Sequence, residues 1–223
     1  MKYFREMRIC VLSVYTPNYD IGYKTDRINR KYCEKHGYDY KVFHTIHPQT
    51  CDKHPSWTRL PYILDVMSEY DYVFWIDSDA FFCNHDKRIE DWIIPGKDIC
   101  ACIDAGDGTD MSRINAGAMI VKNTKWTGDY LEQLITSTSF IPYYRSAMLQ
   151  LEQGAIRKTI MEYPGVAEHM GVITDTRFNN NTTDVKSYIE NGGFILHMTN
   201  FNGTFPDQDR DSVVRDYELH INK

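Results

Sequence analysis

The chain has 223 residues, of which 42% are hydrophobic and 25% charged, a composition typical of a globular protein with a substantial core. The net charge is −6 and no basic stripe runs along the sequence, which excludes nucleic acid as the main partner. The apolar run near the N-terminus is too short for a signal peptide or a transmembrane segment. We therefore expect a cytoplasmic protein, acting alone or as part of a larger multidomain protein.

Strands and helices alternate along the first half of the chain. Apolar runs predict strands at residues 8–15, 38–44, 72–76, 98–104, 116–123 and 192–200, and helical spacing predicts helices at residues 25–36, 56–67, 124–137, 146–162 and 207–221. We expect Gly37 to end the first helix and Ser56 to cap the second. This order predicts an α/β fold in which helices flank a mixed, largely parallel central sheet.

Two carboxylates, Asp77 and Asp79, end the apolar strand in the segment YVFWIDSDAFF. Ligands of α/β folds collect at the carboxyl ends of strands, and alternate residues of an extended segment point the same way. Buried carboxylates are costly unless a cation or hydrogen-bond donors compensate their charge. We therefore predict that both carboxylates face one hard divalent cation. The same Asp-x-Asp spacing recurs within residues 207–211, where no apolar strand precedes it.

The segment WTRLPYILDVM, followed by YDYVFWIDSDAFF, resembles glycosyltransferase family 34, which includes galactosyl-, mannosyl- and xylosyltransferases of the GT-A fold. The start of the family's helix is matched by Trp57, Arg59, Leu60 and Pro61, with Arg in place of Lys. YCEKHGYDY, INAGAMIVKNTKW, EQGAI and GGFILHMTNFNG also match in the family's order, and Glu152 replaces its Asp. The resemblance covers roughly residues 32–203. More loosely, the chain is similar to soluble glycosyltransferase domains of large algal viruses.

The resemblance implies a single GT-A domain, which is Rossmann-like, over residues 1–223. Its nucleotide-binding part would cover about residues 1–110, its sugar and acceptor part about 111–205, and a C-terminal helix about 206–220. The implied reaction moves a hexose, pentose or deoxyhexose from a UDP-sugar to a glycan acceptor, with retention of anomeric configuration. Mn²⁺, with Mg²⁺ as the alternative, would neutralise charge on the departing diphosphate.

The resemblance also implies a set of site residues. Asp77, Asp79 and His197 would bind the metal, since a mixed set of carboxylate and imidazole ligands suits Mn²⁺. Glu152 and Gln153 would be catalytic by stabilising a positively charged sugar, and Glu152 is also a candidate nucleophile or acceptor contact. The nucleotide and donor would bind to Tyr15, Thr16, Tyr19, Trp57, Arg59, Asp77, Ser78, Asn115, Ala116, Gly117, Asn200 and Gly203.

One position departs from the family pattern. The family has a Lys shortly after its His, whereas this chain continues from His197 as MTNFNG. Neutralisation of the diphosphate is then left to the metal, to Arg59 or to main-chain amides of this loop. Gly117 would let the main chain approach the sugar closely, because it carries no side chain.

A phosphohydrolase of the haloacid dehalogenase type is an alternative interpretation of the same acidic pair. In such an enzyme Asp77 would be the nucleophile, Asp79 the second acid, and residues 106–110 a later acidic motif. Phe81 stands where that class has Thr or Val, and the strand lies far into the chain. These departures place the phosphohydrolase behind the glycosyltransferase.

Two further metal-binding interpretations involve other segments. A calcium loop would use Asp207, Asp209, Asp211 and Glu218, but Ser212 replaces the turn glycine and the spacing that follows is helical. A zinc site would use His44, His47, Cys51 and His54, whose spacing fits no standard zinc motif. Both are weaker than the glycosyltransferase interpretation.

Overall fold

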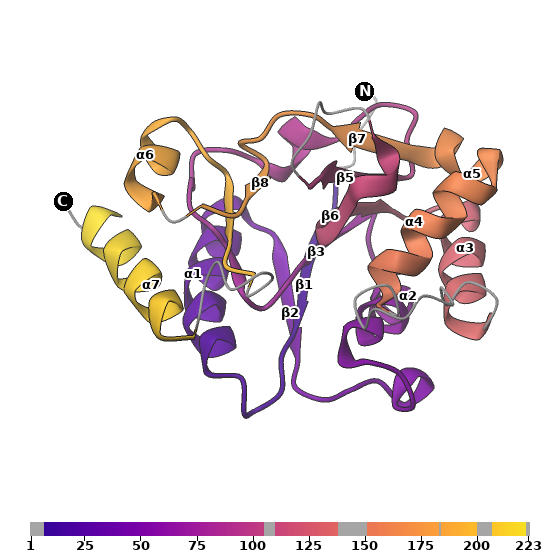
Figure 1. Ribbon diagram of the computed structural model, residues 1–223, viewed down its shortest axis with the longest axis horizontal. Helices are drawn as coiled ribbons and strands as arrows, with labels where there is room; N and C mark the ends of the chain where they lie inside the picture. The colour runs from indigo at the N-terminus through magenta and orange to yellow at the C-terminus, as the bar shows by residue number, and fades with distance from the viewer. Residues whose placement is uncertain (1–6, 105–109, 138–150, 183, 200–206, 222–223) are drawn as a thin grey trace, which may run out of the picture.

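The computed structural model of the protein describes residues 7–104, 110–137, 151–182, 184–199 and 207–221. A six-stranded sheet runs through its centre in the order β2–β1–β3–β6–β5–β7 (Figure 1). Its strands are β1 (Ile9–Val14), β2 (Asp39–Phe43), β3 (Tyr72–Ile76), β5 (Ile99–Ile103), β6 (Ile114–Lys122) and β7 (Met170–Ile173). β6 is antiparallel to β3 and β5, and the other neighbours pair in parallel. The predicted mixed, largely parallel sheet is confirmed.

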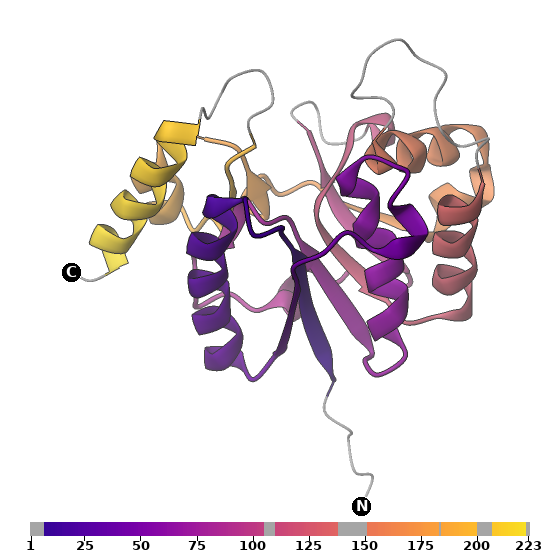
Figure 2. The same ribbon diagram turned by 90° about the horizontal axis from the view of Figure 1, so that it is seen from below.

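Helices cover both faces of this sheet (Figures 1 and 2). On one side lie α1 (Asp20–His36), α6 (Val185–Glu190) and α7 (Asp207–Ile221), and on the other α2 (Arg59–Met67), α3 (Lys125–Thr136), α4 (Glu152–Glu162) and α5 (Pro164–His169). Short 3-10 helices are η1 (Pro48–Thr50), η2 (Pro55–Thr58), η3 (Ile89–Trp92) and η4 (Met111–Arg113). None of the helices in the described ranges has the length and apolar character needed to cross a bilayer.

The central strands are apolar at successive positions because both faces of the sheet are covered. In β1, Val11 belongs to the apolar cluster that includes Tyr32 of α1, whereas Leu12 belongs to the cluster that includes Ile63 of α2. All four side chains are fully buried. Continuous apolar runs of this kind are typical of strands buried between two helical layers.

A second sheet joins the end of β3 to a late part of the chain. β4 (Ala80–Phe82), β9 (Ile195–His197) and β8 (Asn179–Asn180) pair in the order β4–β9–β8. β4 follows β3 directly after residues 77–79, and its antiparallel pairing with β9 places Ala80 opposite His197. This register brings His197 next to Asp79, although the two are far apart in the sequence.

Most predicted elements are present, with differences at their ends. Residues 72–76 form β3 and residues 207–221 form α7 as predicted, and Gly37 ends α1 with a φ of 72°. α1 begins earlier than predicted, at Asp20, because Ile21 already packs in an apolar cluster with residues of α7. The predicted cap at Ser56 is wrong: the His54 side chain accepts a hydrogen bond from the Ser56 amide and caps η2, from which α2 continues.

Several short elements were not predicted from the sequence. They are β4, β7, β8, α5 and α6, each of six residues or fewer. A segment of this length spans too few residues for its hydrophobic period to be recognised. The predicted helix start at residue 146 lies outside the described residues, and α4 is described from Glu152.

Asn29 of α1 fixes the outer edge of β4. Its side chain is 1% exposed, its Nδ2 donates to the Ala80 carbonyl at 3.1 Å, and its Oδ1 accepts from the Phe82 amide at 3.0 Å. The side-chain amide therefore takes the place of a neighbouring strand at this edge. β4 in turn holds the residues just before it in position.

We expect Asn29→Ala to lower the free energy of unfolding by about 2–4 kcal/mol, because it leaves two buried main-chain groups of β4 without partners. Urea denaturation followed by circular dichroism measures this loss. Lys31→Ala, at an exposed position on the same helix, is the matched control and should change stability by less than about 0.5 kcal/mol. Equal effects of the two substitutions would contradict the assigned role of Asn29.

Candidate functional site

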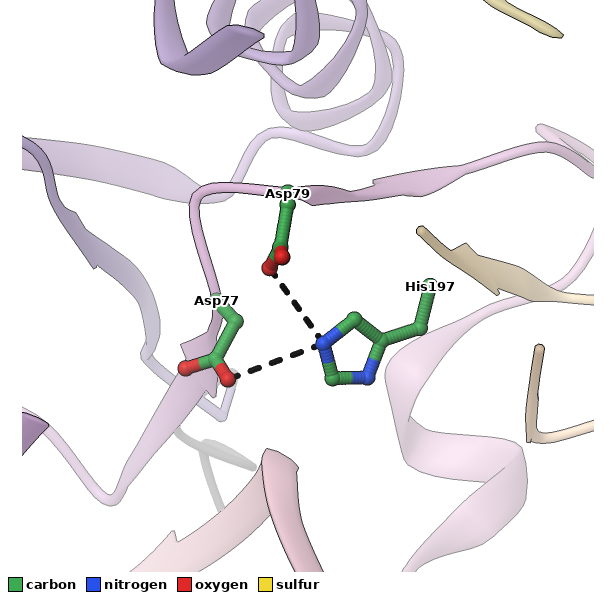
Figure 3. Close-up of side chains that lie close together, drawn as sticks. All are labelled: Asp77, Asp79 and His197. Atoms are coloured by element: carbon green, nitrogen blue, oxygen red, sulfur yellow. Dashed lines mark ion pairs between the residues drawn. The ribbon is translucent and has the colours of Figure 1, made fainter. Parts of the chain in front are cut away.

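Asp77 and Asp79 lie at the carboxyl end of β3, and the His197 ring points between them from the end of β9 (Figure 3). His197 Nε2 is 3.3 Å from Asp79 Oδ1 and 3.7 Å from Asp77 Oδ2. Each of the three residues offers a ligand atom, and these atoms all lie within 4.8 Å of one another. The structure thus brings together the three side chains that were predicted to bind a metal.

Asp77 uses its two oxygens in different directions. Oδ1 accepts a hydrogen bond from the Trp75 indole at 2.7 Å and pairs with Arg59 Nη2 at 3.0 Å. Oδ2 is the oxygen that faces His197. The donors behind Asp77 therefore fix its orientation toward the shared position.

Asp79 is arranged in the same way on the opposite side. Its Oδ1 faces His197, while its Oδ2 accepts a hydrogen bond from the Tyr19 hydroxyl at 3.3 Å and lies 3.4 Å from Arg210 Nη2. Tyr19 belongs to the loop before α1, and Arg210 to the first turns of α7. Each carboxylate thus presents one oxygen to the imidazole and keeps the other against donors.

Arg59 lies inside the protein rather than on its surface. Its side chain is enclosed, its Nε is 3.1 Å from Glu152 Oε1, and its Nη1 donates to the Ala116 carbonyl. The guanidinium also lies over the Trp75 ring, 5.0 Å from its centroid. Arg59 therefore connects α2 to β3, β6 and α4, with its charge directed at the partly buried Asp77 and the buried Glu152.

Burial and the neighbouring charges act in opposite directions on the ionisable groups of this site. Burial raises the pKa of Asp77 against the opposing charge of Arg59. Burial also works to raise the pKa of Asp79, but the hydrogen bond and charge of His197 outweigh it and the pKa is lowered. For His197, burial lowers the pKa, but Asp79 more than compensates and the net shift is upward. Burial raises the pKa of Glu152, although Arg59 lies beside it.

Main-chain hydrogen bonds fix the turn that carries the two aspartates. The Asp77 amide donates to the Gly117 carbonyl at 2.8 Å, and the Met198 amide donates to the Asp79 carbonyl at 2.8 Å. Between them, the Ser78 carbonyl accepts from the Thr25 hydroxyl at 2.7 Å. The turn is therefore tied to β6, to the residue after β9 and to α1.

Gly117 of β6 makes room for the imidazole. A Cβ at this position would lie 2.1 Å from His197 Cε1, far inside van der Waals contact. The lack of a side chain at Gly117 therefore lets His197 reach the two carboxylates. Two carboxylate oxygens and one imidazole nitrogen, so placed, fit a divalent ion such as Mn²⁺.

The residues predicted to contact the sugar surround the start of β6 and of α4. Gln153 Oε1 accepts a hydrogen bond from the Ala116 amide at 2.7 Å, and Asn115 Oδ1 accepts from the Gly117 amide at 2.8 Å. Glu152 is 1% exposed, and its Oε2 has no hydrogen-bond partner among the described residues. Gln153 and Asn115 thus fix the main chain around Gly117.

The remaining predicted donor contacts have different surroundings. Tyr15 is buried after β1, with its ring edge-on to Tyr23 and His44, and the Thr16 carbonyl accepts a hydrogen bond from the Tyr19 amide at 2.9 Å. Trp57 is 1% exposed and packs in the main apolar core, an environment typical of a structural residue. Asn200 and Gly203 lie outside the described residues.

The calcium interpretation does not agree with the structure. Residues 207–221 form one continuous helix, whereas a calcium loop must bend around the ion. Asp211 and Glu218 instead form ion pairs with Lys24 and Arg27 of α1. Asp211 and Glu218 therefore attach α7 to α1.

The zinc and phosphohydrolase interpretations gain no support either. His47 pairs with Asp65 at 3.1 Å, His54 caps η2, and the proposed zinc ligands do not gather into a metal-binding group within the described chain. Residues 106–109 of the phosphohydrolase motif lie outside the described residues.

Sequence reasoning missed several residues that hold the site. Trp75 shares the Asp77 side of β3 by strand alternation, so this position was open to prediction. No sequence pattern pointed to Arg210, because this residue is far from Asp79 in the sequence and only the tertiary fold brings the two together. Around Asn115 lie three further polar residues, Asp104, Arg157 and Asn179.

We expect Gly117→Ala to lower the free energy of unfolding by about 1–3 kcal/mol, because the new methyl group would displace the His197 ring. Gly128→Ala is the matched control, since nothing lies within 4 Å of a Cβ at that position of α3. The control should stabilise the protein by about 0.5–1 kcal/mol. Urea denaturation distinguishes the two, and a stabilising Gly117→Ala would contradict the close approach described above.

We also expect the metal-free protein to show a pH dependence that originates in the Asp79–His197 pair. The raised pKa of His197 means that its contribution to stability is full below the ordinary value of 6.5 and is lost as the pH rises through the folded-state value. The lowered pKa of Asp79 means that its contribution is present above 3.8 and is lost as the pH falls through the folded-state value. The Asp79–His197 pair therefore stabilises the folded protein most between pH 3.8 and pH 6.5.

His197→Gln tests this dependence in the presence of a chelator. The difference in free energy of unfolding between wild type and variant should be larger at about pH 5 than at about pH 9, as measured by urea denaturation. An equal difference at both pH values would contradict the pairing.

Comparison with known proteins agrees with the motifs. The model of the galactosyl transferase GMA12/MNN10 family matches residues 20–103, which include β3 and both aspartates. An uncharacterized α-1,2-galactosyltransferase of Schizosaccharomyces pombe is 24% identical over 76% of this chain and 53% of its own length. The chain thus spans about half the length of this curated relative.

Solved glycosyltransferases share the fold. A glycosyltransferase involved in the glycosylation of the major capsid of PBCV-1 has a TM-score of 0.66 at 19% identity, over 95% of this chain and 99% of that one. GlyE of Streptococcus pneumoniae TIGR4 has a TM-score of 0.61 at 16% identity, over 96% and 61%. The galactosyltransferase LgtC, solved with donor and acceptor sugar analogues, has a TM-score of 0.59 at 10% identity, over 93% and 95%. The resemblance to glycosyltransferase family 34 found in the sequence is therefore confirmed, and the chain has the GT-A fold of these solved glycosyltransferases.

Proposed function

We propose that the protein is a metal-dependent glycosyltransferase that moves a hexose, pentose or deoxyhexose from a UDP-sugar to a glycan acceptor. The observation that carries this proposal is the convergence of Asp77, Asp79 and His197 at the carboxyl end of β3. The fold shared with solved glycosyltransferases supports it. Galactose is the first donor sugar to test, because the curated relative is named a galactosyltransferase.

A divalent ion, Mn²⁺ or Mg²⁺, held by Asp77, Asp79 and His197 would stabilise the negative charge that develops on the departing diphosphate. Arg59 and Trp75 hold Asp77 in place for this task. Because its nitrogens face Asp77, Glu152 and the Ala116 carbonyl, we assign Arg59 a positioning role within the donor site. The carboxylates are thus oriented before any ligand arrives, which avoids reorganisation during the reaction.

At the sugar, we propose a front-face displacement with retention of configuration. The bond between the sugar and the diphosphate breaks, the acceptor oxygen bonds to the same face, and the acceptor proton passes to a diphosphate oxygen. Gln153, fixed by the Ala116 amide, would lie beneath the positively charged sugar. Glu152 is enclosed and ion-paired with Arg59, which favours electrostatic stabilisation over nucleophilic attack.

The nucleotide would bind at the carboxyl ends of β1 and β2. Tyr15, Tyr23 and His44 form an aromatic cluster there, with ring centroids of Tyr15 and its two neighbours 4.9 and 4.6 Å apart. A uracil base would stack on such a cluster, with Thr16 and Tyr19 beside it. Ser78, the segment Asn115 to Gly117, and the residues Asn200 and Gly203 complete the proposed donor contacts.

The test is stabilisation of the protein by UDP, with and without Mn²⁺. A ligand at about 100 times its Kd stabilises the folded state by about 2.7 kcal/mol, so thermal unfolding should shift upward only when both are present. Asp79→Ala should abolish the shift, because it removes a metal ligand. Asp216→Ala, at an exposed position on α7, is the control and should leave the shift unchanged.

Stabilisation by UDP alone, or an undiminished shift in Asp79→Ala, would overturn the metal-dependent mechanism. Incubation with Mn²⁺ and individual UDP-sugars, starting with UDP-galactose, then identifies the donor by the UDP released.

A further inference from the structure

Arg210 of α7 is a buried cation beside the candidate metal site. Its side chain is 5% exposed; Nη1 donates to the Tyr19 hydroxyl at 2.9 Å and Nη2 lies 3.4 Å from Asp79 Oδ2. The guanidinium also lies over the Tyr19 ring, 5.9 Å from its centroid. Arg210 thus contacts the side of Asp79 opposite to the one that faces His197.

The helix that carries Arg210 is firmly attached to the rest of the protein. Val213, Val214 and Tyr217 of α7 are buried in one apolar cluster with Leu196, the residue before His197. Ion pairs from Lys24 to Asp211 and from Arg27 to Glu218 join α7 to α1. These contacts fix α7, and with it Arg210, beside Asp79.

The charges of the site favour a cation at this place once the nucleotide has bound. With His197 neutral as a metal ligand, ionised Asp77, Asp79 and Glu152 carry three negative charges, and Arg59 and Arg210 carry two positive ones. A divalent ion changes this sum from −1 to +1, and a bound nucleoside diphosphate adds at least about two negative charges. Without Arg210 the occupied site would carry a larger negative excess in a poorly solvated place.

The two arginines of the site do not have equivalent positions. Arg59 faces two carboxylates and a carbonyl from behind Asp77, between β3, β6 and α4. Arg210 approaches from the other side, next to Tyr19, where β1 and α1 lead to the proposed nucleotide position. The Lys that the family pattern places after its His is also missing here, as MTNFNG shows.

We propose that Arg210 binds the diphosphate of the donor and so replaces the missing lysine with a cation from the C-terminal helix. This inference rests on the proposed function. A guanidinium presents several N–H donors in one plane and pairs well with phosphate oxygens, and Asp79 and Tyr19 orient it until the nucleotide arrives. Through this contact between Arg210 and the diphosphate, α7 would take part in donor binding.

The experiment measures binding of Mn²⁺, UDP and uridine separately, by electron paramagnetic resonance of the ion and by calorimetry of the nucleotide at saturating Mn²⁺. In Arg210→Met we expect UDP affinity to fall about ten- to a hundredfold, as for loss of a charge-assisted hydrogen bond. Uridine affinity should change by less than about twofold, and Mn²⁺ affinity should be unchanged or higher, because a neighbouring positive charge is removed. Arg215→Met, at an exposed position of α7, is the matched control.

Three outcomes would overturn the proposal. If Arg210 only positioned Asp79, Mn²⁺ affinity would fall together with UDP affinity, and if it had no role in binding, UDP affinity would not change. Arg210→Lys keeps the charge and should lose less UDP affinity than Arg210→Met, so an equal loss would assign the effect to packing. Arg210→Gln replaces the methionine variant if circular dichroism shows that the latter does not fold.

Failure of this inference and failure of the proposed function have different signatures. If the wild-type protein binds no UDP in the presence of Mn²⁺, the proposed function is contradicted, and so is the role of Arg210 in diphosphate binding. Wild-type protein that binds UDP, combined with an unaffected Arg210→Met, contradicts only the role of Arg210.

Discussion

Two carboxylates at the end of a central strand impose the main constraint on this fold. Asp77 and Asp79 lie close together where water is scarce, and such a pair is stable only with compensating charges and donors. The protein supplies Arg59 from one helix and Arg210 from another, and the His197 imidazole between the carboxylates. Elements from the beginning, middle and end of the chain must therefore meet at one point.

The same constraint explains how the site combines stability with function. A buried ion pair contributes little net stability, because desolvation of its charges opposes their attraction. The proposed reaction would justify this cost, because it requires a cation to be held next to a phosphate. The enclosed position of Arg59 and the absence of a side chain at Gly117 both serve this arrangement. Stability is instead provided by the two apolar layers on either side of the central sheet.

Much of the fold follows from sequence, and the limits of that inference have a physical basis. β3 shows as a continuous apolar run, α7 is long enough for its helical period to show, and Gly37 marks a helix end because few other residues adopt its conformation. β4, in contrast, is too short to show a period, and its pairing with β9 depends on tertiary contacts. Motif order was enough to connect Asp79 with His197, but no local pattern connected either of them with Arg210.

The pairing of β4 with β9 also has a consequence for protein synthesis. The ribosome releases β3 and both aspartates well before it makes β9 and α7, so the early nascent chain holds two acids without their imidazole or their second arginine. Such a chain has an unpaired strand edge at β4, which is a point where other chains can attach.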